Sequence, residues 1–409
     1  MLQDMATFAA FLPGTAPRAW ITLTAVSAVY FLITATTFTS LGVVLPSMIG
    51  ELHWSWSEAG LGFTLLGVVC GLTSTIPAWL IRHAGVRATL VLGSAVMAAA
   101  FLCLAQTRGV LLYDIACCLA GLGFTLLATV PGTYLLARCF ARPSFAFGLY
   151  FTVGGLGGVA GPLGFLRILS VSGHWRDYWL ASAASVAVAG LFAAALVDVT
   201  TDLQAAPSDS SGSAPRAWTA AAAALRTPQF AILAAAYGCF LLVGITVNAV
   251  SVGHLVQRGV PAVLAGSLLS VEAFINAAAR IGGGALGNVI DPRKLLALSL
   301  LALIAGLVAL SFAHSLPLLL LYAACIGIGY GLTFFASTIL LLNYFGAAAN
   351  LELFSIVNLI ATLASVGPLL AGWTHDVTGG FVPFLLVLAV FVALVLIAVL
   401  AMRPPARPA

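Results

Sequence analysis

Charge is the scarcest property of this 409-residue sequence. Asp, Glu, Lys and Arg together make up 7% of it, against about 25% in soluble globular proteins, whereas hydrophobic residues make up 62%. So few charges cannot cover a water-facing surface of this size, and most of the chain is therefore expected to face lipid. The formal net charge of +4 comes from scattered residues, which excludes a nucleic-acid partner because that binding needs clustered basic side chains.

Residues that hold metals or cofactors are also few. The seven cysteines have no ligand spacing and lie in apolar runs, so we interpret them as packing residues. The six histidines fall in loops or at the ends of apolar stretches, whereas a membrane haem or metal enzyme needs them inside its bundle. The sequence contains no nucleotide-binding loop and no nucleophile paired with a base. We therefore expect no enzyme, no cofactor and no metal site.

Long apolar runs dominate the sequence instead. A transmembrane helix needs about 20 mainly apolar residues. Twelve such stretches lie between charged and turn-forming residues: 20–49, 58–80, 88–105, 110–136, 145–168, 178–197, 229–253, 263–290, 294–312, 316–342, 352–373 and 382–402. The polar segment between the sixth and seventh divides them equally. We predict an all-α membrane protein with a six-helix bundle over 1–197, a cytoplasmic linker over 198–228 and a second six-helix bundle over 229–409.

Basic residues are unevenly shared between the two membrane faces. With both termini inside, 11 of the 16 Lys and Arg residues fall on the cytoplasmic side and four on the outer side. Cytoplasmic loops carry an excess of Lys and Arg. The distribution therefore predicts a multi-pass protein of the plasma (cytoplasmic) membrane with both termini in the cytoplasm. Nothing in this pattern requires an oligomer.

The two halves of the sequence repeat each other at an offset of 206 residues. The matched pairs are Gly60 with Gly266, Arg87 with Arg293, Gly121 with Gly327, Gly123 with Gly329, and the Gly-Pro-Leu run 161–163 with 367–369. A shared Gly-Pro-Leu and a shared Gly-x-Gly in one ungapped register are not expected by chance. Two parallel repeats that hold a substrate between them near the membrane midplane are typical of secondary transporters.

Arg280 is the basic residue left over inside a predicted span, near mid-membrane. Its guanidinium stays charged, and a charge at that depth costs about 2.5–3.5 kcal/mol on insertion scales. Glu272 and Asn276 are spaced to share its helix face, but Glu272 lies about 12 Å away along the axis, too far for a direct pair. One interpretation is a structural pair between Arg280 and another helix. We favour a fixed cation that lines a central cavity and binds a carboxylate through two parallel hydrogen bonds.

Further candidates for the substrate site lie at mid-depth in other spans: Tyr330, Phe334 and Phe335 in the tenth, Tyr30 in the first and Asn358 in the eleventh. Ordinary helix packing is the alternative interpretation for each of them. Two carboxyl groups are candidates for carrying a proton. Glu272 lies inside the eighth span, and Asp114, in the outer part of the fourth, also fits an interfacial charge.

Several motifs together resemble one family. Residues 42–46 and 50–58 read Gly-Val-Val-Leu-Pro and Gly-Glu-Leu-His-Trp-Ser-Trp-Ser-Glu, and Gly148, Gly157, Gly161 and Pro162 have the G-x8-G-x3-G-P spacing. These segments resemble the major facilitator superfamily, and within it the monocarboxylate transporter and oxalate/formate exchanger branch. The resemblance covers essentially the whole chain and implies a major facilitator fold of twelve transmembrane helices. Arg280 matches the arginine that binds the substrate carboxylate in monocarboxylate carriers.

The resemblance implies a secondary transporter of small monocarboxylates, lactate- or pyruvate-like, that works by alternating access. We expect Asn276 and Tyr330 to contact the substrate's hydroxyl or keto group, and Phe334 and Phe335 to exclude water. The sequence departs from the family at Asn276, where the carriers have an acid, and in lacking the first-span lysine. Proton symport is favoured, with anion exchange of the oxalate/formate type as the alternative. A cation or drug exporter with Glu272 as its cation site, or a non-transporting receptor, is less favoured.

Overall fold

The computed structural model describes residues 17–140, 143–197, 222–286 and 290–403, and within these ranges it contains helices and no strand. In the described chain, eleven helical segments are long and apolar enough to cross a membrane, and Trp56–Leu72 is a shorter apolar helix. The predicted all-α membrane fold is therefore confirmed.

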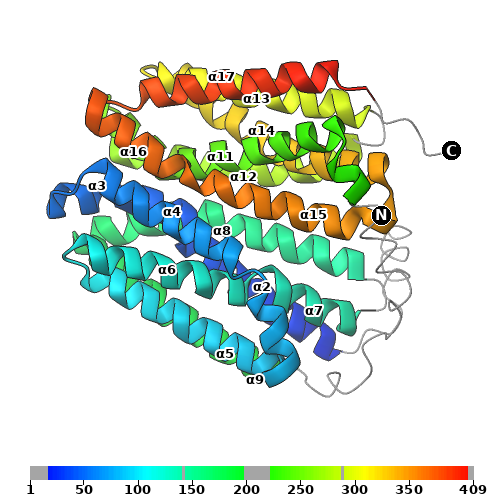
Figure 1. The fold of residues 1–409 in the computed structure, drawn as a ribbon. Helices are drawn as coiled ribbons and strands as arrows, with labels where there is room; N and C mark the ends of the chain where they lie inside the picture. Colours follow the sequence, from blue (N-terminus) through cyan, green and yellow to red (C-terminus); the bar gives the residue numbers. More distant parts are fainter. Residues whose placement is uncertain (1–16, 141–142, 198–221, 287–289, 404–409) are drawn as a thin grey trace, which may run out of the picture.

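The helices form two groups that are consecutive in sequence, seen one above the other in Figure 1. The first comprises α2 (Pro17–Thr36), α3 (Phe38–Leu52), α4 (Trp56–Leu72), α5 (Ile76–Gln106), α6 (Val110–Leu127), α7 (Thr129–Cys139), α8 (Pro143–Ser172) and α9 (Trp175–Leu196). The second comprises α11 (Pro228–Gln257), α12 (Ala262–Leu286), α13 (Pro292–Ser311), α14 (Leu316–Phe345), α15 (Ala347–Thr362), the 3-10 helix η2 (Leu363–Val366), α16 (Gly367–Thr378) and α17 (Val382–Ala401). Most of the predicted linker 198–228 lies outside the described residues, so the predicted domain boundaries stay a prediction.

The second and third spans divide differently from the expected stretches 58–80 and 88–105. Helix α4 ends at Leu72, and after a short turn the chain continues as α5. Helix α5 is kinked at Gly85, whose φ of +82° favours glycine because it has no Cβ. The predicted second span therefore corresponds to α4 plus the first turns of α5, and the third to α5 beyond the kink.

Three spans are interrupted in mid-course. Breaks lie at Thr37 between α2 and α3, at Ala128 between α6 and α7, and at residues 363–366 between α15 and α16. Pro131 contributes to the second break, because proline lacks the N–H that would bond the carbonyl four residues earlier. The Tyr150 hydroxyl donates to the carbonyl of Ala128 at 2.9 Å. Such partners are needed because lipid cannot satisfy backbone groups that a break sets free.

Close helix contacts recur at the offset of 206 residues. A Cβ atom on Gly121 would lie 2.5 Å from the carbonyl oxygen of Leu66, and one on Gly327 would lie 2.7 Å from that of Glu272. Both the glycines and their partners are 206 residues apart. The absence of a side chain therefore sets the same helix approach in each group, α4 against α6 and α12 against α14.

The matched arginines also make equivalent contacts. Arg87 donates from Nε and Nη2 to the carbonyl oxygen of Val197, at 3.2 and 2.8 Å. Arg293 donates from Nε to that of Val399 at 3.0 Å, and from Nη2 to that of Leu400. Each arginine thus binds carbonyl groups at the C-terminus of the last helix in its group, where a positive charge also complements the helix dipole.

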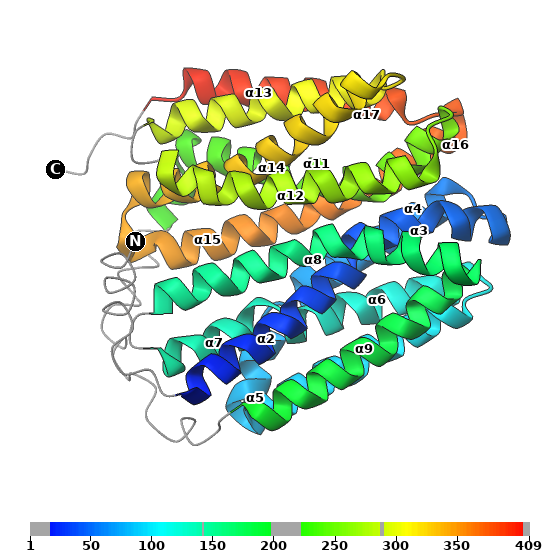
Figure 2. The ribbon, with the colours of Figure 1, turned by 180° about the vertical axis from the view of Figure 1, so that it is seen from behind.

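The two groups contact each other through α4 with α16, α8 with α12, and α3 with α11 (Figures 1 and 2). Backbones approach closely where glycine replaces a side chain: Gly42 lies against Asn248, Gly60 against Pro368, and Gly372 against Trp56. We call the end of the molecule with the α3–α4 turn the closed end. The opposite end, where α2 begins and α17 ends, is called the open end.

Asp376 of α16 joins the two groups at the closed end. Its carboxylate accepts hydrogen bonds from the backbone N–H groups of Trp56, at 3.1 Å, and Ser57, at 2.8 Å, and from the Ser57 hydroxyl. These N–H groups belong to the first turn of α4. A carboxylate of the second group therefore caps a helix of the first.

Candidate substrate site

Two cavities, among those that the described residues form, lie between the helix groups and meet near the centre of the molecule. The larger, about 780 Å³, has walls from α4, α6 and α7 on one side and α11, α14 and α15 on the other. The smaller, about 240 Å³, lies between α2, α3, α8 and α12. Phe38, Phe124 and Arg280 line both. The breaks at Thr37 and Ala128 also line them, so irregular backbone occurs where it borders a cavity.

The larger cavity extends towards the open end. Its lining includes Thr75, after α4 ends, and Val130, beyond the break after α6, together with Phe354 in α15. The closed end, in contrast, is occupied by the backbone contacts between α3, α4, α11 and α16. The molecule is therefore tightly packed on one side of the cavities, and the larger cavity reaches towards the other.

Arg280 is exposed to both cavities and has no acidic partner among the described residues. Its Nε donates to Asn276 Oδ1 at 3.1 Å. The guanidinium carbon lies 4.8 Å from the ring centre of Phe334 and 5.7 Å from that of Tyr330, within range of cation–π attraction. No Asp or Glu of the described chain lines either cavity. The structure therefore presents Arg280 as a fixed cation that faces open space.

Helix α14 sets the position of Arg280 through a second glycine. A Cβ atom on Gly331 would lie 2.6 Å from the carbonyl oxygen of Asn276 and 3.2 Å from the backbone nitrogen of Arg280. Gly327 makes the equivalent contact one turn earlier, against Glu272. Close approach along this pair of glycines holds α12 against α14, with the guanidinium beside the aromatic rings of α14.

The structure places five of the other predicted residues on the cavity walls. Tyr330, Phe334 and Asn358 line the larger cavity, and Asn276 and Tyr30 line the smaller. The polar groups of Asn358 already have partners, since Oδ1 accepts from the Tyr237 hydroxyl at 3.0 Å and Nδ2 donates to the Phe354 carbonyl at 2.8 Å. The Tyr30 ring stacks on that of Tyr150, with centres 4.7 Å apart.

Three predicted residues line neither cavity. Phe335 packs against Gly283 of α12. Glu272 is 4% exposed and lies behind the cavity wall in the contact between α12 and α14, within electrostatic reach of Tyr322. Asp114 is half-buried on α6, and Glu58 acts on it electrostatically. In the described chain, no hydrogen bond or ion pair joins either candidate proton carrier to Arg280.

Sequence reasoning missed Phe38, Phe124 and Ser74, which line the larger cavity. The repeat could have found two of them. Phe124 lies 206 residues before Tyr330, and Ser74 lies 206 residues before Arg280. Nothing in the sequence distinguished Phe38 from other aromatic residues of the first span.

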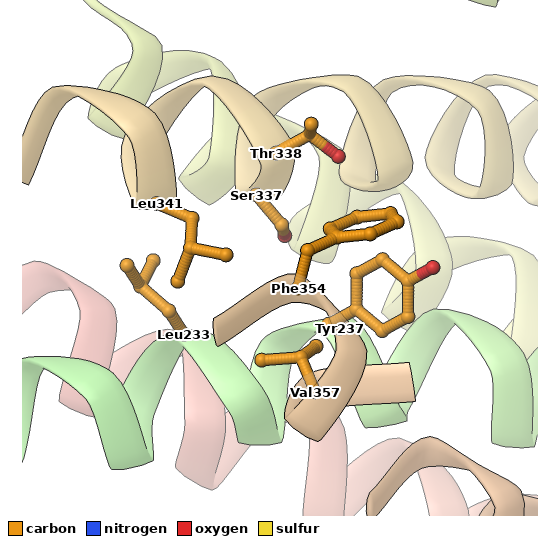
Figure 3. Close-up of a pocket in the computed structure, with 7 residues that line it drawn as sticks. All are labelled: Leu233, Tyr237, Ser337, Thr338, Leu341, Phe354 and Val357. Atoms are coloured by element: carbon orange, nitrogen blue, oxygen red, sulfur yellow. The ribbon is translucent and has the colours of Figure 1, made fainter. Parts of the chain in front are cut away.

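A third hollow borders the larger cavity and is shown in Figure 3. Its lining residues are Leu233, Tyr237, Ser337, Thr338, Leu341, Phe354 and Val357. It has no room for a water molecule, so it is a packing gap rather than a binding site. Nowhere in the described ranges do three or more His, Cys, Asp or Glu side chains come together as a metal site requires.

The sequence profile of the Major Facilitator Superfamily matches residues 26–290 and 256–409. The chain belongs to the major facilitator superfamily. It is therefore a multi-pass membrane transporter with a substrate site expected between its two helix groups. No curated protein sequence matches this transporter.

Solved structures share the fold of this transporter at low sequence identity. A bacterial homologue of the human lysosomal transporter Spinster, inward-facing and unoccupied, has a TM-score of 0.78 and 16% identity, over 95% of this chain and 97% of that one. The nucleoside transporter NupG has a TM-score of 0.76 and 14% identity, over 94% and 99%. At these identities the likeness establishes the fold alone, so the monocarboxylate branch rests on the sequence motifs.

Proposed function

We propose that this transporter carries organic monocarboxylates across the plasma membrane by alternating access, with Arg280 as the carboxylate anchor. The observation that carries the proposal is an exposed guanidinium at the junction of two cavities whose described lining contains no acid. Asn276 occupies Nε, which leaves both terminal amino groups of the guanidinium for a carboxylate. A planar fork of donors suits two parallel hydrogen bonds to that group.

The membrane orientation follows from the distribution of basic residues. With both termini in the cytoplasm, the open end faces the cytoplasm and the closed end faces outward, which corresponds to an inward-facing state. Residues on the wall then meet the organic part of the substrate. Tyr330 and Phe334 are the first of these, since their rings lie beside the guanidinium.

The driving ion is the second part of the proposal. Proton symport needs a titratable group that gains and loses a proton during the cycle, and the carboxyl group of Glu272 is the candidate because it lies on the helix of Arg280. Anion exchange of the oxalate/formate type is the second candidate function. The absence of Asp and Glu from the described cavity walls favours it, because an arginine alone cannot release a proton. The same absence disfavours a cation exporter.

Substitution of the anchor tests the anion site. We expect Arg280→Ala and Arg280→Lys to abolish carboxylate binding by the purified transporter and counterflow in proteoliposomes, because lysine lacks the fork. Arg258→Ala is the matched control, since Arg258 is an exposed residue at the end of α11 and lines neither cavity. Carboxylate uptake by Arg280→Ala equal to that of the control variant would refute the proposal.

An imposed pH gradient tests whether carboxylate transport is coupled to protons or to exchange with another anion. Wild-type proteoliposomes loaded with unlabelled acid should exchange labelled lactate under either mechanism. Protein-free liposomes under the same gradient measure the passive entry of undissociated lactic acid. Above that background, only a symporter accumulates lactate when the outside is made acidic and no internal anion is present. Accumulation under that gradient assigns symport, whereas uptake that requires an internal anion assigns exchange.

A further inference from the structure

Aromatic rings from both helix groups face the junction that holds Arg280. Among the described residues, the half-buried rings on the walls of the larger cavity are Phe38, Phe124, Tyr330, Phe334 and Phe354. Half-burial matters here, because a fully buried ring packs only against protein and has no face left for a ligand. These rings therefore offer apolar surface directly to whatever binds at the guanidinium.

The second helix group supplies a continuous aromatic wall. The ring centres of Phe240 and Tyr330 lie 5.1 Å apart, those of Phe240 and Phe334 lie 5.9 Å apart, and those of Tyr237 and Phe354 lie 5.8 Å apart. Phe240 and Tyr237 are 2% and 4% exposed, so they support the wall from behind. Phe334 packs edge-to-face on Phe240 and Tyr330 packs on it at a tilt of 59°, so the buried Phe240 ring supports both side chains in the orientation they have in the wall.

The first helix group supplies the opposite wall. Phe38 and Phe124 form a T-shaped pair with centres 5.5 Å apart, and Phe38 also packs against the buried Phe63, at 6.1 Å. Both members of the pair line the same two cavities as Arg280. A carboxylate bound to Arg280 therefore has Tyr330 and Phe334 on one side and Phe38 and Phe124 on the other. We call these four residues the aromatic slot.

We propose that the substrate is a monocarboxylate whose organic part carries an aromatic ring, held in the aromatic slot while Arg280 binds the carboxylate. The inference rests on the proposed function and narrows its substrate class. A ring gains from apolar burial and from edge or face contacts with the four side chains, whereas a two- to four-carbon acid reaches few of them. The size of the larger cavity, about 780 Å³, also falls in the range of about 300–1,000 Å³ found for sites that enclose drug-sized ligands.

Paired acids that differ only in the ring test the inference. Isothermal titration of the purified wild-type transporter in nanodiscs would compare phenylpyruvate with pyruvate, and phenylacetate with acetate. We expect each ring-bearing acid to bind at least about tenfold more tightly, as two or more ring contacts imply. Cyclohexylacetate, of similar size without aromaticity, should bind more weakly than phenylacetate. Phenylacetamide, which lacks the charge, should not bind.

Substitutions in the aromatic slot test whether its rings cause the tighter binding of ring-bearing acids. Phe124→Leu and, separately, Phe38→Leu keep apolar volume but remove a ring. Each should lower phenylpyruvate affinity by about three- to tenfold and pyruvate affinity by clearly less, because pyruvate has no ring to lose a ring contact. Phe145→Leu is the control, because Phe145 is 54% exposed and lines neither cavity.

The outcomes separate the two proposals. Equal affinities for phenylpyruvate and pyruvate, both lost in Arg280→Ala, would overturn the aromatic slot and leave the carboxylate site intact. Equal affinities for cyclohexylacetate and phenylacetate would overturn the aromatic part in favour of apolar size alone. Binding of phenylacetamide as tight as that of phenylacetate, or binding that survives in Arg280→Ala, would overturn the carboxylate site itself.

Discussion

The cap that Asp376 places on α4 should control opening of the closed end. Alternating access requires the two helix groups to separate there, and separation breaks every hydrogen bond between Asp376 and the first turn of α4. Helix α4 keeps its own cap when this happens, because Ser55 and Glu58 form a capping box within the first group. Asp376→Ala therefore weakens the closed state without removing the cap that α4 needs to stay folded.

The magnitude follows from the bonds that are lost. Loss of an N-cap costs about 0.5–2 kcal/mol, and hydrogen bonds to a charged group contribute about 1.5–3 kcal/mol. The Asp376 side chain is 26% exposed, so water recovers part of this hydrogen-bond energy when the bonds break. We expect Asp376→Ala to destabilise the closed state by about 1–3 kcal/mol, which shifts the equilibrium towards opening by roughly 5- to 150-fold. Asp376→Asn keeps one acceptor oxygen, so its population of the open state should lie between those of wild type and Asp376→Ala.

Spin labels across the closed end measure the shift. A Cβ atom at Gly50 or Gly380 would have nothing within 4 Å, so cysteines there would carry labels on the two helix groups without disturbing them. The seven native cysteines would be replaced in all variants alike. Double electron–electron resonance in nanodiscs should show a larger long-distance population for Asp376→Ala than for wild type.

Thr374→Ala is the matched control on the same helix, since the Thr374 hydroxyl bonds only the Leu370 carbonyl of its own helix. Its distance distribution should equal that of wild type. If Asp376→Ala and Thr374→Ala give the same distribution, the cap contributes nothing to closure and the reasoning is refuted.

Three further predictions concern the site, the coupling and the stability of the helix groups. Gly331→Leu should weaken carboxylate binding by about tenfold or more in isothermal titration, because a side chain 2.6 Å from the Asn276 carbonyl displaces α12 and the guanidinium with it. Glu272→Gln should retain counterflow in proteoliposomes but lose accumulation driven by a pH gradient, if its carboxyl carries the proton. Arg293→Gln and Arg87→Gln should each lower stability by about 1–2 kcal/mol, seen as a lower Tm in detergent, because each leaves helix C-terminal carbonyls without their charged donor.

Each of these has its own control. Gly164→Leu should leave carboxylate affinity unchanged, since nothing lies within 4 Å of a Cβ there. Asp114→Asn should accumulate substrate like wild type under a pH gradient. If Asp114→Asn loses this accumulation and Glu272→Gln keeps it, Asp114 is the proton carrier instead of Glu272. Arg258→Gln should keep the wild-type Tm, and an equal decrease in Arg258→Gln and Arg293→Gln would contradict the role of the carbonyl contacts.

Much of the fold could be predicted from the sequence because lipid imposes rules that act on short stretches of chain. A span needs a long apolar run, so composition and run length alone indicate an all-helical membrane protein. The sequence repeat at an offset of 206 residues also appears in the structure, since Gly121 and Gly327 make the same helix contact in each group. Arg280 stood out for a similar reason, because a charge in mid-membrane is costly wherever the helices lie.

Only the tertiary structure decided which neighbours of Arg280 belong to its site. Phe334 and Phe335 are adjacent in sequence, but about 100° of helix rotation separates them, and only Phe334 reaches the cavity. Glu272 is spaced to share a face of α12 with Arg280, but its side chain is buried and its backbone carbonyl lies against Gly327 of α14. Phe38 and Phe124 face the same cation from the other helix group. That arrangement depends on how two bundles far apart in sequence pack together, which no local pattern specifies.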